Sequence, residues 1–147
     1  MISTTIDQEI KQAMLAKNQA KLRGLRAIKA ALLLARTEKG SEEVTEEGEL
    51  KILQKLIKQR RESADIYKQQ GREDLSVIEE EEIEVINAFL PKQLDRGDVE
   101  QIISKIIKDS GANSVKDMGK VMGLANKELA GKADGKLIAE VVKIQLA

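Results

Sequence analysis

The 147-residue sequence contains no cysteine and no histidine. The absence of cysteine excludes disulfide bonds, thiolate catalysis and zinc–sulfur sites. The absence of histidine excludes Ser–His–Asp triads, histidine-ligated metals and Glu-x-x-His di-iron sites. No serine or threonine can therefore be activated by a histidine base. We expect no catalytic residue, no metal site and no cofactor.

Aromatic side chains and long apolar runs are also scarce. Tyr67 and Phe89 are the only aromatic residues, so the core must be aliphatic, and few rings are available to stack on exposed bases. The longest aliphatic run near the start, Leu32 to Leu34, is too short to span a membrane. The N-terminal stretch MISTTIDQEIK carries acids where a signal peptide would be apolar. These features predict a cytoplasmic protein without a membrane partner.

What the chain has in abundance is helix-forming residues and balanced charge. Lys and Arg number 25, and Asp and Glu also number 25. Positive charge prevails in residues 1–70 and negative charge in residues 71–94. The zero net charge argues against a protein that coats nucleic acid, but it allows a local basic patch.

The spacing of apolar residues predicts an all-α protein without strands. The expected helices cover about 4–17, 19–39, 45–70, 73–90, 96–110, 115–130 and 135–146. Gly40 should end the second helix, and Pro91 should stop the fourth. The expected N-caps are Asn18, Thr45, Ser114 and Asp134. A boundary in the segment PKQLD would divide the chain into modules of residues 1–92 and 93–147.

The stretch 116–138, KDMGKVMGLANKELAGKADGKLI, is rich in both lysine and glycine. It is no P-loop, because none of its three Gly-Lys pairs is followed by Ser or Thr. On a helix its apolar residues form a core face: Met118, Val121, Met122, Ala125 and Leu129. The lysines lie on a separate face and continue beyond it, and we expect them to contact RNA: Lys116, Lys120, Lys127, Lys132 and Lys136.

Two glycines of the same stretch, Gly119 and Gly123, are expected to let another backbone pack closely. The alternative for the whole stretch is a solvated lysine face with small residues at a helix crossing.

A second basic surface is predicted on the second and third helices. Its members are Arg26, Lys29 and Arg36, with Lys21, Arg23 and Lys39 nearby, and the run KLIKQRR from Lys55 to Arg61. Ordinary surface with ion pairs to glutamates remains the alternative. The run Glu79 to Glu82 points around its helix, so we expect a solvated acidic collar rather than a metal or acid–base site.

Several segments together resemble the GatB/YqeY family, that is, YqeY-like proteins and the tail domain of the B subunit of the glutamine-dependent tRNA amidotransferase. The matching segments are LRAIKAAL (25–32), KQRRESADIYKQQGREDL (58–75), FLPKQL (89–94), SGANSVKDMGKVMG (110–123) and GKADGKLI (131–138). The pair KDMGKVMG and GKADG at this spacing is the most specific part. Members often carry basic residues around an apolar one where this chain reads Glu128-Leu129-Ala130.

The resemblance implies an N-terminal four-helix bundle followed by a C-terminal three-helix bundle. It also implies association with tRNA, or with an amidotransferase or aminoacyl-tRNA synthetase component. The first hypothesis is a non-catalytic tRNA-binding module. The alternatives are an adaptor that docks a partner helix in a glycine-lined groove between the two bundles, and an accessory to a carbon–nitrogen ligase that uses glutamine as amido donor.

Overall fold

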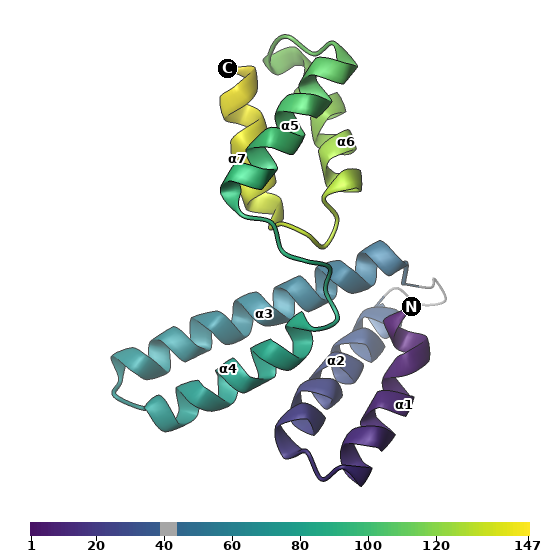
Figure 1. Cartoon of the computed structure of the whole chain (residues 1–147), viewed down its shortest axis with the longest axis vertical. Coiled ribbons are helices and arrows are strands. Elements are labelled where there is room, and N and C mark those ends of the chain that lie inside the picture. The colour runs from purple at the N-terminus through teal and green to yellow at the C-terminus, as the bar shows by residue number, and fades with distance from the viewer. Residues whose placement is uncertain (39–43) are drawn as a thin grey trace. The chain divides into compact units, whose positions relative to one another are not determined.

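The computed structural model describes residues 1–38 and 44–147, and within them all regular structure is helical (Figure 1). The all-α prediction is confirmed. The α-helices are α1 (Ile2–Leu15), α2 (Gln19–Glu38), α3 (Glu46–Gln69), α4 (Glu73–Asn87), α5 (Arg96–Ser110), α6 (Met118–Glu128) and α7 (Gly135–Leu146), and a 3-10 turn, η1 (Val115–Asp117), precedes α6. The predicted helix end at Gly40 lies outside the described residues.

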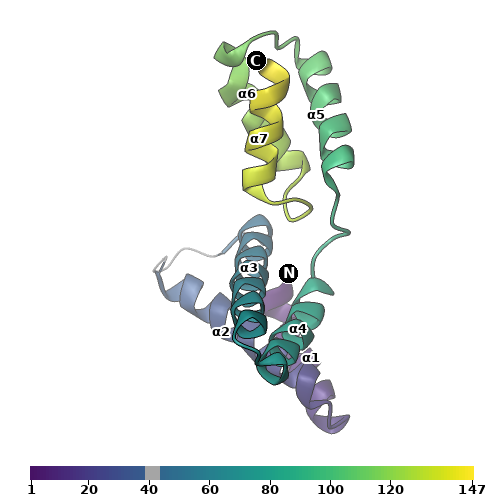
Figure 2. The same ribbon diagram turned by 90° about the vertical axis from the view of Figure 1, so that its left-hand side faces the viewer.

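Two compact units divide the chain, Met1–Leu90 and Pro91–Ala147. The expected boundary after residue 92 falls two residues later than this division. Unit 1 holds α1 to α4, and unit 2 holds α5 to α7, a grouping compatible with the two bundles that the family resemblance implies (Figures 1 and 2). Among the described residues, no helix combines the length and the apolarity that a bilayer span needs.

The core of unit 1 is aliphatic and joins all four helices. Its largest buried side chains include Leu25 and Ile28 of α2, Leu53 of α3 and Ile86 of α4. On α1 the spacing of Ile6, Ile10 and Met14 predicts one apolar stripe, but Met14 is exposed and Ala13 is buried instead. Seven residues make almost two full turns, so position 13 returns to the face of Ile6, whereas position 14 lies a further 100° around.

The core of unit 2 is also aliphatic, built from all three helices. Val99 and Ile103 of α5 pack with Val121 and Ala125 of α6 and with Val142 of α7. Met118 and Met122 are partly buried against this cluster. The predicted core face of the sixth helix is therefore confirmed, and the opposite face of α6 is turned away from the core.

Polar side chains cap the N-termini of four of the helices. Asn18 accepts from the Lys21 amide, Thr45 from Gly48 and Asp134 from Lys136. Asp95 and Asp98 form a reciprocal capping box at the start of α5, with Gly111 in the left-handed conformation at its end. The expected cap at Ser114 is wrong, because its side chain makes no capping bond and a 3-10 turn follows it.

Candidate nucleic-acid interface

Three of the five predicted RNA-contacting lysines lie along α6 and the turn before it. Lys116 is exposed in η1, and Lys120 and Lys127 are exposed on α6. On a regular helix, residues seven apart lie 20° from the same direction, so Lys120 and Lys127 share one face. Lys116 stands on the 3-10 turn rather than on α6. The α-helical spacing that relates Lys120 to Lys127 therefore does not extend back to Lys116.

The other two lysines follow α6. Lys132 is half-buried in the loop between α6 and α7, and Lys136 is exposed in the first turn of α7. The five residues therefore belong to η1, α6, the loop after α6 and α7, which follow one another in unit 2. We call them the lysine surface: Lys116, Lys120, Lys127, Lys132 and Lys136.

The lysine surface carries positive charge that is not paired with any carboxylate of the described chain. None of its five ammonium groups forms an ion pair within residues 1–38 and 44–147. Lys120 Nζ donates to the Ser110 carbonyl oxygen at 3.3 Å, which leaves its charge uncompensated. Unpaired cations on an exposed helix face are the groups that polyanion phosphates contact.

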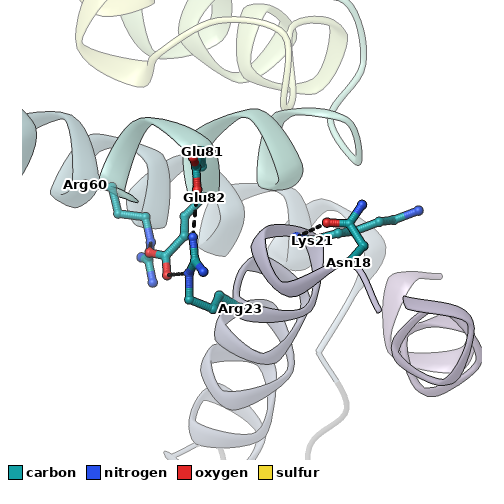
Figure 3. Close-up of polar contacts among 6 residues, drawn as sticks. All are labelled: Asn18, Lys21, Arg23, Arg60, Glu81 and Glu82. Atoms are coloured by element: carbon teal, nitrogen blue, oxygen red, sulfur yellow. Dashed lines mark hydrogen bonds and ion pairs between the residues drawn. The ribbon is translucent and has the colours of Figure 1, made fainter. Parts of the chain in front are cut away.

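The second basic surface, on α2 and α3, is different because many of its cations are paired. Arg23 lies 2.7 Å from the Glu81 carboxylate, and Arg60 Nε donates to Glu82 at 2.9 Å (Figure 3). Lys29 pairs with Asp7, and Lys21 lies 3.8 Å from Glu9. Three of the six cations predicted on the second helix are thus compensated within unit 1. Arg26 and Arg36 form no ion pair within the described residues, and Lys39 lies outside them.

The same ion pairs correct the interpretation of the acidic run on α4. Glu80 pairs with Lys68, Glu81 with Arg23 and Glu82 with Arg60, so three of its four members are bound to cations rather than merely solvated. Burial and the neighbouring Glu82 charge raise the pKa of Glu79 above its ordinary value. Among the described residues, no group of three or more acidic side chains is arranged to hold a metal ion.

The prediction that Gly119 and Gly123 pack against another backbone is contradicted within the described chain. A Cβ atom added at either residue would meet no heavy atom within 4 Å. Both glycines are exposed, like Lys120 and Lys127 on the same helix. The close approach lies at Gly24 instead, where an added Cβ would stand 2.6 Å from the Val85 Cβ atom of α4.

The loop after α6 is held by a segment that precedes α5. Gln93 Nε2 donates to the Gly131 carbonyl oxygen at 2.7 Å, and the Leu94 amide donates to the Lys132 carbonyl oxygen at 2.9 Å. The two quoted segments FLPKQL and GKADGKLI therefore touch each other in space. Local residue patterns do not predict this contact, because the partners are 38 residues apart. The one hint of it in the sequence is that both segments belong to the family resemblance.

The position at which family members often carry basic residues has a different role here. Glu128 is exposed beside Lys127, Leu129 is fully buried in the core, and Ala130 is half-buried. The apolar centre of this triplet is therefore a core residue. Glu128 places one negative charge next to the lysine surface, which lowers its local positive potential.

Comparison with known proteins identifies the family. The sequence profile described as "Yqey-like protein" matches residues 3–146. "Altered inheritance of mitochondria protein 41, mitochondrial" of Clavispora lusitaniae is 29% identical over 131 residues, which cover 86% of this chain and 75% of the relative. The protein of the same name from Vanderwaltozyma polyspora is 28% identical over 120 residues, covering 77% of this chain and 64% of the relative.

These matches correct one expectation and confirm another. The predicted cytoplasmic location is overturned, because both relatives are named as mitochondrial proteins. The resemblance to YqeY-like proteins is confirmed, since the profile spans nearly the whole sequence. The chain belongs to the YqeY-like family.

Proposed function

We propose that this protein is a non-catalytic tRNA-binding module and that the lysine surface of unit 2 contacts the phosphate backbone. The observation that carries the proposal is the set of five lysines without a carboxylate partner in the described chain. Most cations of α2, in contrast, already pair with acids of α1 and α4. The resemblance to the amidotransferase tail domain supplies tRNA as the polyanion.

Shape rather than sequence should govern this binding. Lysine ammonium groups act as point charges and lack the planar fork with which arginine reads guanine. Tyr67 and Phe89, the only aromatic residues, both belong to unit 1. Backbone contact with a folded RNA needs only cations at a suitable spacing. The protein should therefore prefer folded tRNA to a single strand of equal length and discriminate little among base sequences.

Gly119 and Gly123 support the proposal by leaving the helix backbone open. The space beside both residues is empty to 4 Å within the described chain. A glycine inside a helix costs stability relative to alanine, and at these two positions no contact with the rest of the described chain offsets that cost. A bare backbone on either side of Lys120 would let a phosphate chain approach α6 more closely than side chains would allow.

Titration of the full chain with folded tRNA at several salt concentrations tests the proposal. Three to five phosphate contacts predict that log affinity falls against log salt with a slope of roughly −2 to −4.5. The triple variant Lys116→Ala, Lys120→Ala, Lys136→Ala should bind more weakly, with a slope flatter by about one unit per lost contact.

The matched control is Lys55→Ala, Lys58→Ala, Arg61→Ala on α3, which removes the same charge from three exposed residues that also lack an ion pair within the described chain. This control should change the tRNA affinity and the salt slope less than the triple variant of Lys116, Lys120 and Lys136 does. Absence of tRNA binding by the wild type at low salt would refute the proposal. Equal effects of the two triple variants would refute the assignment to unit 2.

A second candidate is an adaptor that docks a partner helix on α6. Exposed apolar side chains beside the open glycines favour it: Leu124 on α6 is 43% exposed and Val115 on η1 is 56% exposed. A partner helix would bind through these apolar side chains, and its affinity would depend little on salt concentration. Replacement of Leu124 by Ser should abolish such binding, whereas it should leave phosphate contacts by the lysines nearly unchanged.

A further inference from the structure

Gln93 stands in the segment before α5 and uses both hydrogens of its side-chain amide. Nε2 donates to the Gly131 carbonyl oxygen at 2.7 Å and to the Pro91 carbonyl oxygen at 2.9 Å. The next residue, Leu94, donates its backbone amide to the Lys132 carbonyl oxygen. Two consecutive carbonyl groups of the α6–α7 loop are thus bound by two consecutive residues of the entering segment.

Most of the loop between α6 and α7 is buried or half-buried, so its backbone polar groups need partners inside the protein. Leu129 is fully buried, Ala133 is 5% exposed, and Gly131 between them is also buried. Between them, Gly131 adopts the left-handed conformation and the Lys132 amide closes a turn onto Leu129. The hydrogen bond from Gln93 to the Gly131 carbonyl oxygen is partly buried. Removing the donor would therefore leave that carbonyl oxygen without a hydrogen-bond partner unless water reached it.

This loop also determines how the lysines of different elements are arranged. Lys120 and Lys127 are carried by α6, Lys132 by the loop itself and Lys136 by α7. The loop and the start of α5 lie at the same end of unit 2 in both views (Figures 1 and 2). A polyanion that contacts several cations at once requires them at a defined spacing, because phosphate contacts set the register of the complex.

We propose that Gln93 is a positioning residue for the lysine surface: by holding the Gly131 carbonyl group, it orients Lys132 and the first turn of α7 for phosphate contact. This inference rests on the proposed function. Gln93 is not itself a binding group, because its amide hydrogens are already used within the protein. Its effect on binding must therefore pass through the loop.

The test is a double-mutant cycle in the full chain, with folded tRNA as the probe. The variants are Gln93→Met, which keeps the length of the side chain and removes the donor, Lys132→Ala, and the two combined. Gln93→Met should flatten the salt slope by about one unit, so the factor by which affinity falls between about 50 and about 200 mM salt should be roughly 4-fold smaller than in the wild type. In the Lys132→Ala background this effect should become smaller, because the residue through which Gln93 acts is gone.

Gln101→Met on α5 is the matched control, since Gln101 is exposed and its side chain makes no hydrogen bond within the described chain. It should bind as the wild type does. If Gln93→Met fails to fold by circular dichroism, Gln93→Asn replaces it, because the shorter amide keeps its polarity and cannot reach Gly131. Its effect should have the same sign.

Two results overturn the inference while leaving the proposed function standing. One is a folded Gln93→Met protein with the wild-type salt slope, measured beside a lysine triple variant that does lose binding. The other is an undiminished effect of Gln93→Met in the Lys132→Ala background, which indicates a general structural role. If the wild type does not bind tRNA, the proposed function fails and the inference fails with it.

Discussion

Two glycines of this chain differ in how much space surrounds them, and they therefore have different roles. Gly24 of α2 lies against Val85 of α4, and an added Cβ would stand 2.6 Å from both the Val85 Cβ and Cγ1 atoms. Gly123 of α6 faces open space. The first glycine is required by packing, whereas the second has no packing partner in the described chain.

Alanine substitutions should separate these roles. Gly123→Ala should raise the free energy of unfolding by about 1 kcal/mol, because glycine inside a helix is less favourable than alanine. Gly119→Ala should raise it less, since this residue lies in the first turn of α6. Gly24→Ala should lower it by about 1–3 kcal/mol through overpacking against Val85. Urea denaturation measures all three, and a destabilising Gly123→Ala would show that α6 has a neighbour there.

Glu49 is the only charged residue buried in the described chain, at 1% exposure. Its carboxylate oxygens accept from the backbone amides of Ile2 at 2.9 Å and Ser3 at 3.0 Å. A carboxylate at the positive end of α1 satisfies amides that no intrahelical partner reaches. A side chain of α3 therefore caps the N-terminus of α1, although Glu49 and Ser3 are 46 residues apart in the sequence.

Replacement of Glu49 by Ala should lower the free energy of unfolding by about 2 kcal/mol, because it leaves partly buried amides without an acceptor. Glu49→Gln should cost less, since its amide oxygen still accepts one bond. Thermal melts followed by circular dichroism provide the measurement. Glu62→Gln, an exposed position on the same helix, is the control and should melt like the wild type. Equal melting of Glu49→Ala and the wild type would exclude the capping role.

At the scale of helices, α4 is held to α2 and α3 by charge as well as by apolar contact. Glu82 lies between Arg60, whose side chain is 18% exposed, and Arg23, whose Nε is 3.9 Å away (Figure 3). Glu79 stands nearby with a raised pKa, caused first by burial and second by the Glu82 charge. Arg60 lowers that pKa but does not cancel the rise.

The raised pKa of Glu79 predicts a pH-dependent stability. The folded state holds the proton of Glu79 more tightly than the unfolded state, so this residue's contribution falls as pH rises from its ordinary pKa of 4.5 through the folded value. Glu79→Gln should therefore melt at a higher temperature than the wild type near neutral pH, and the difference should vanish below the ordinary pKa.

The difference between the two melting curves isolates this contribution, because the lowered pKa values of Asp74 and Glu80 act in the opposite direction and are present in both proteins. Glu84→Gln, an exposed residue of α4, is the control for loss of one negative charge. A difference that grows toward acid pH would contradict the assigned direction.

At the scale of the whole molecule, the segment before α5 belongs to unit 2. Gln93 and Leu94 bond to the α6–α7 loop, and Leu94 packs partly buried against the core of unit 2. A fragment that begins at Asp95, where the predicted fifth helix is capped, lacks these contacts. A fragment that begins at Pro91 retains them.

The fragment of residues 91–147 should be helical and more stable than the fragment of residues 95–147 by about 1–3 kcal/mol, from two hydrogen bonds and the Leu94 contact. Both should be weakly stable, because cores of this size are small. Circular dichroism melts compare them, and Gln93→Met in the longer fragment should lie between the two. Identical midpoints for both fragments would show that the entering segment contributes nothing.

The sequence alone determined the helical class, most helix limits and the core face of α6. These properties depend on local periodicity and on capping residues such as Asn18, Thr45 and Asp134. The fourth helix ends at Asn87, earlier than the stop predicted at Pro91. The sequence also identified the lysines of unit 2 as candidates, since like residues at helical spacing share a face. All of these signals lie within one or two turns of the chain.

Only the tertiary structure decided which charges are compensated and which glycines are crowded. Arg23 meets Glu81 across 58 residues, Gln93 meets Gly131 across 38, and Gly24 meets Val85 at a helix crossing. Each contact depends on how helices distant in sequence are juxtaposed, which a local pattern does not encode. The distinction between the paired cations of α2 and the unpaired lysine surface arises for the same reason: a charge is neutralised by its neighbours in space.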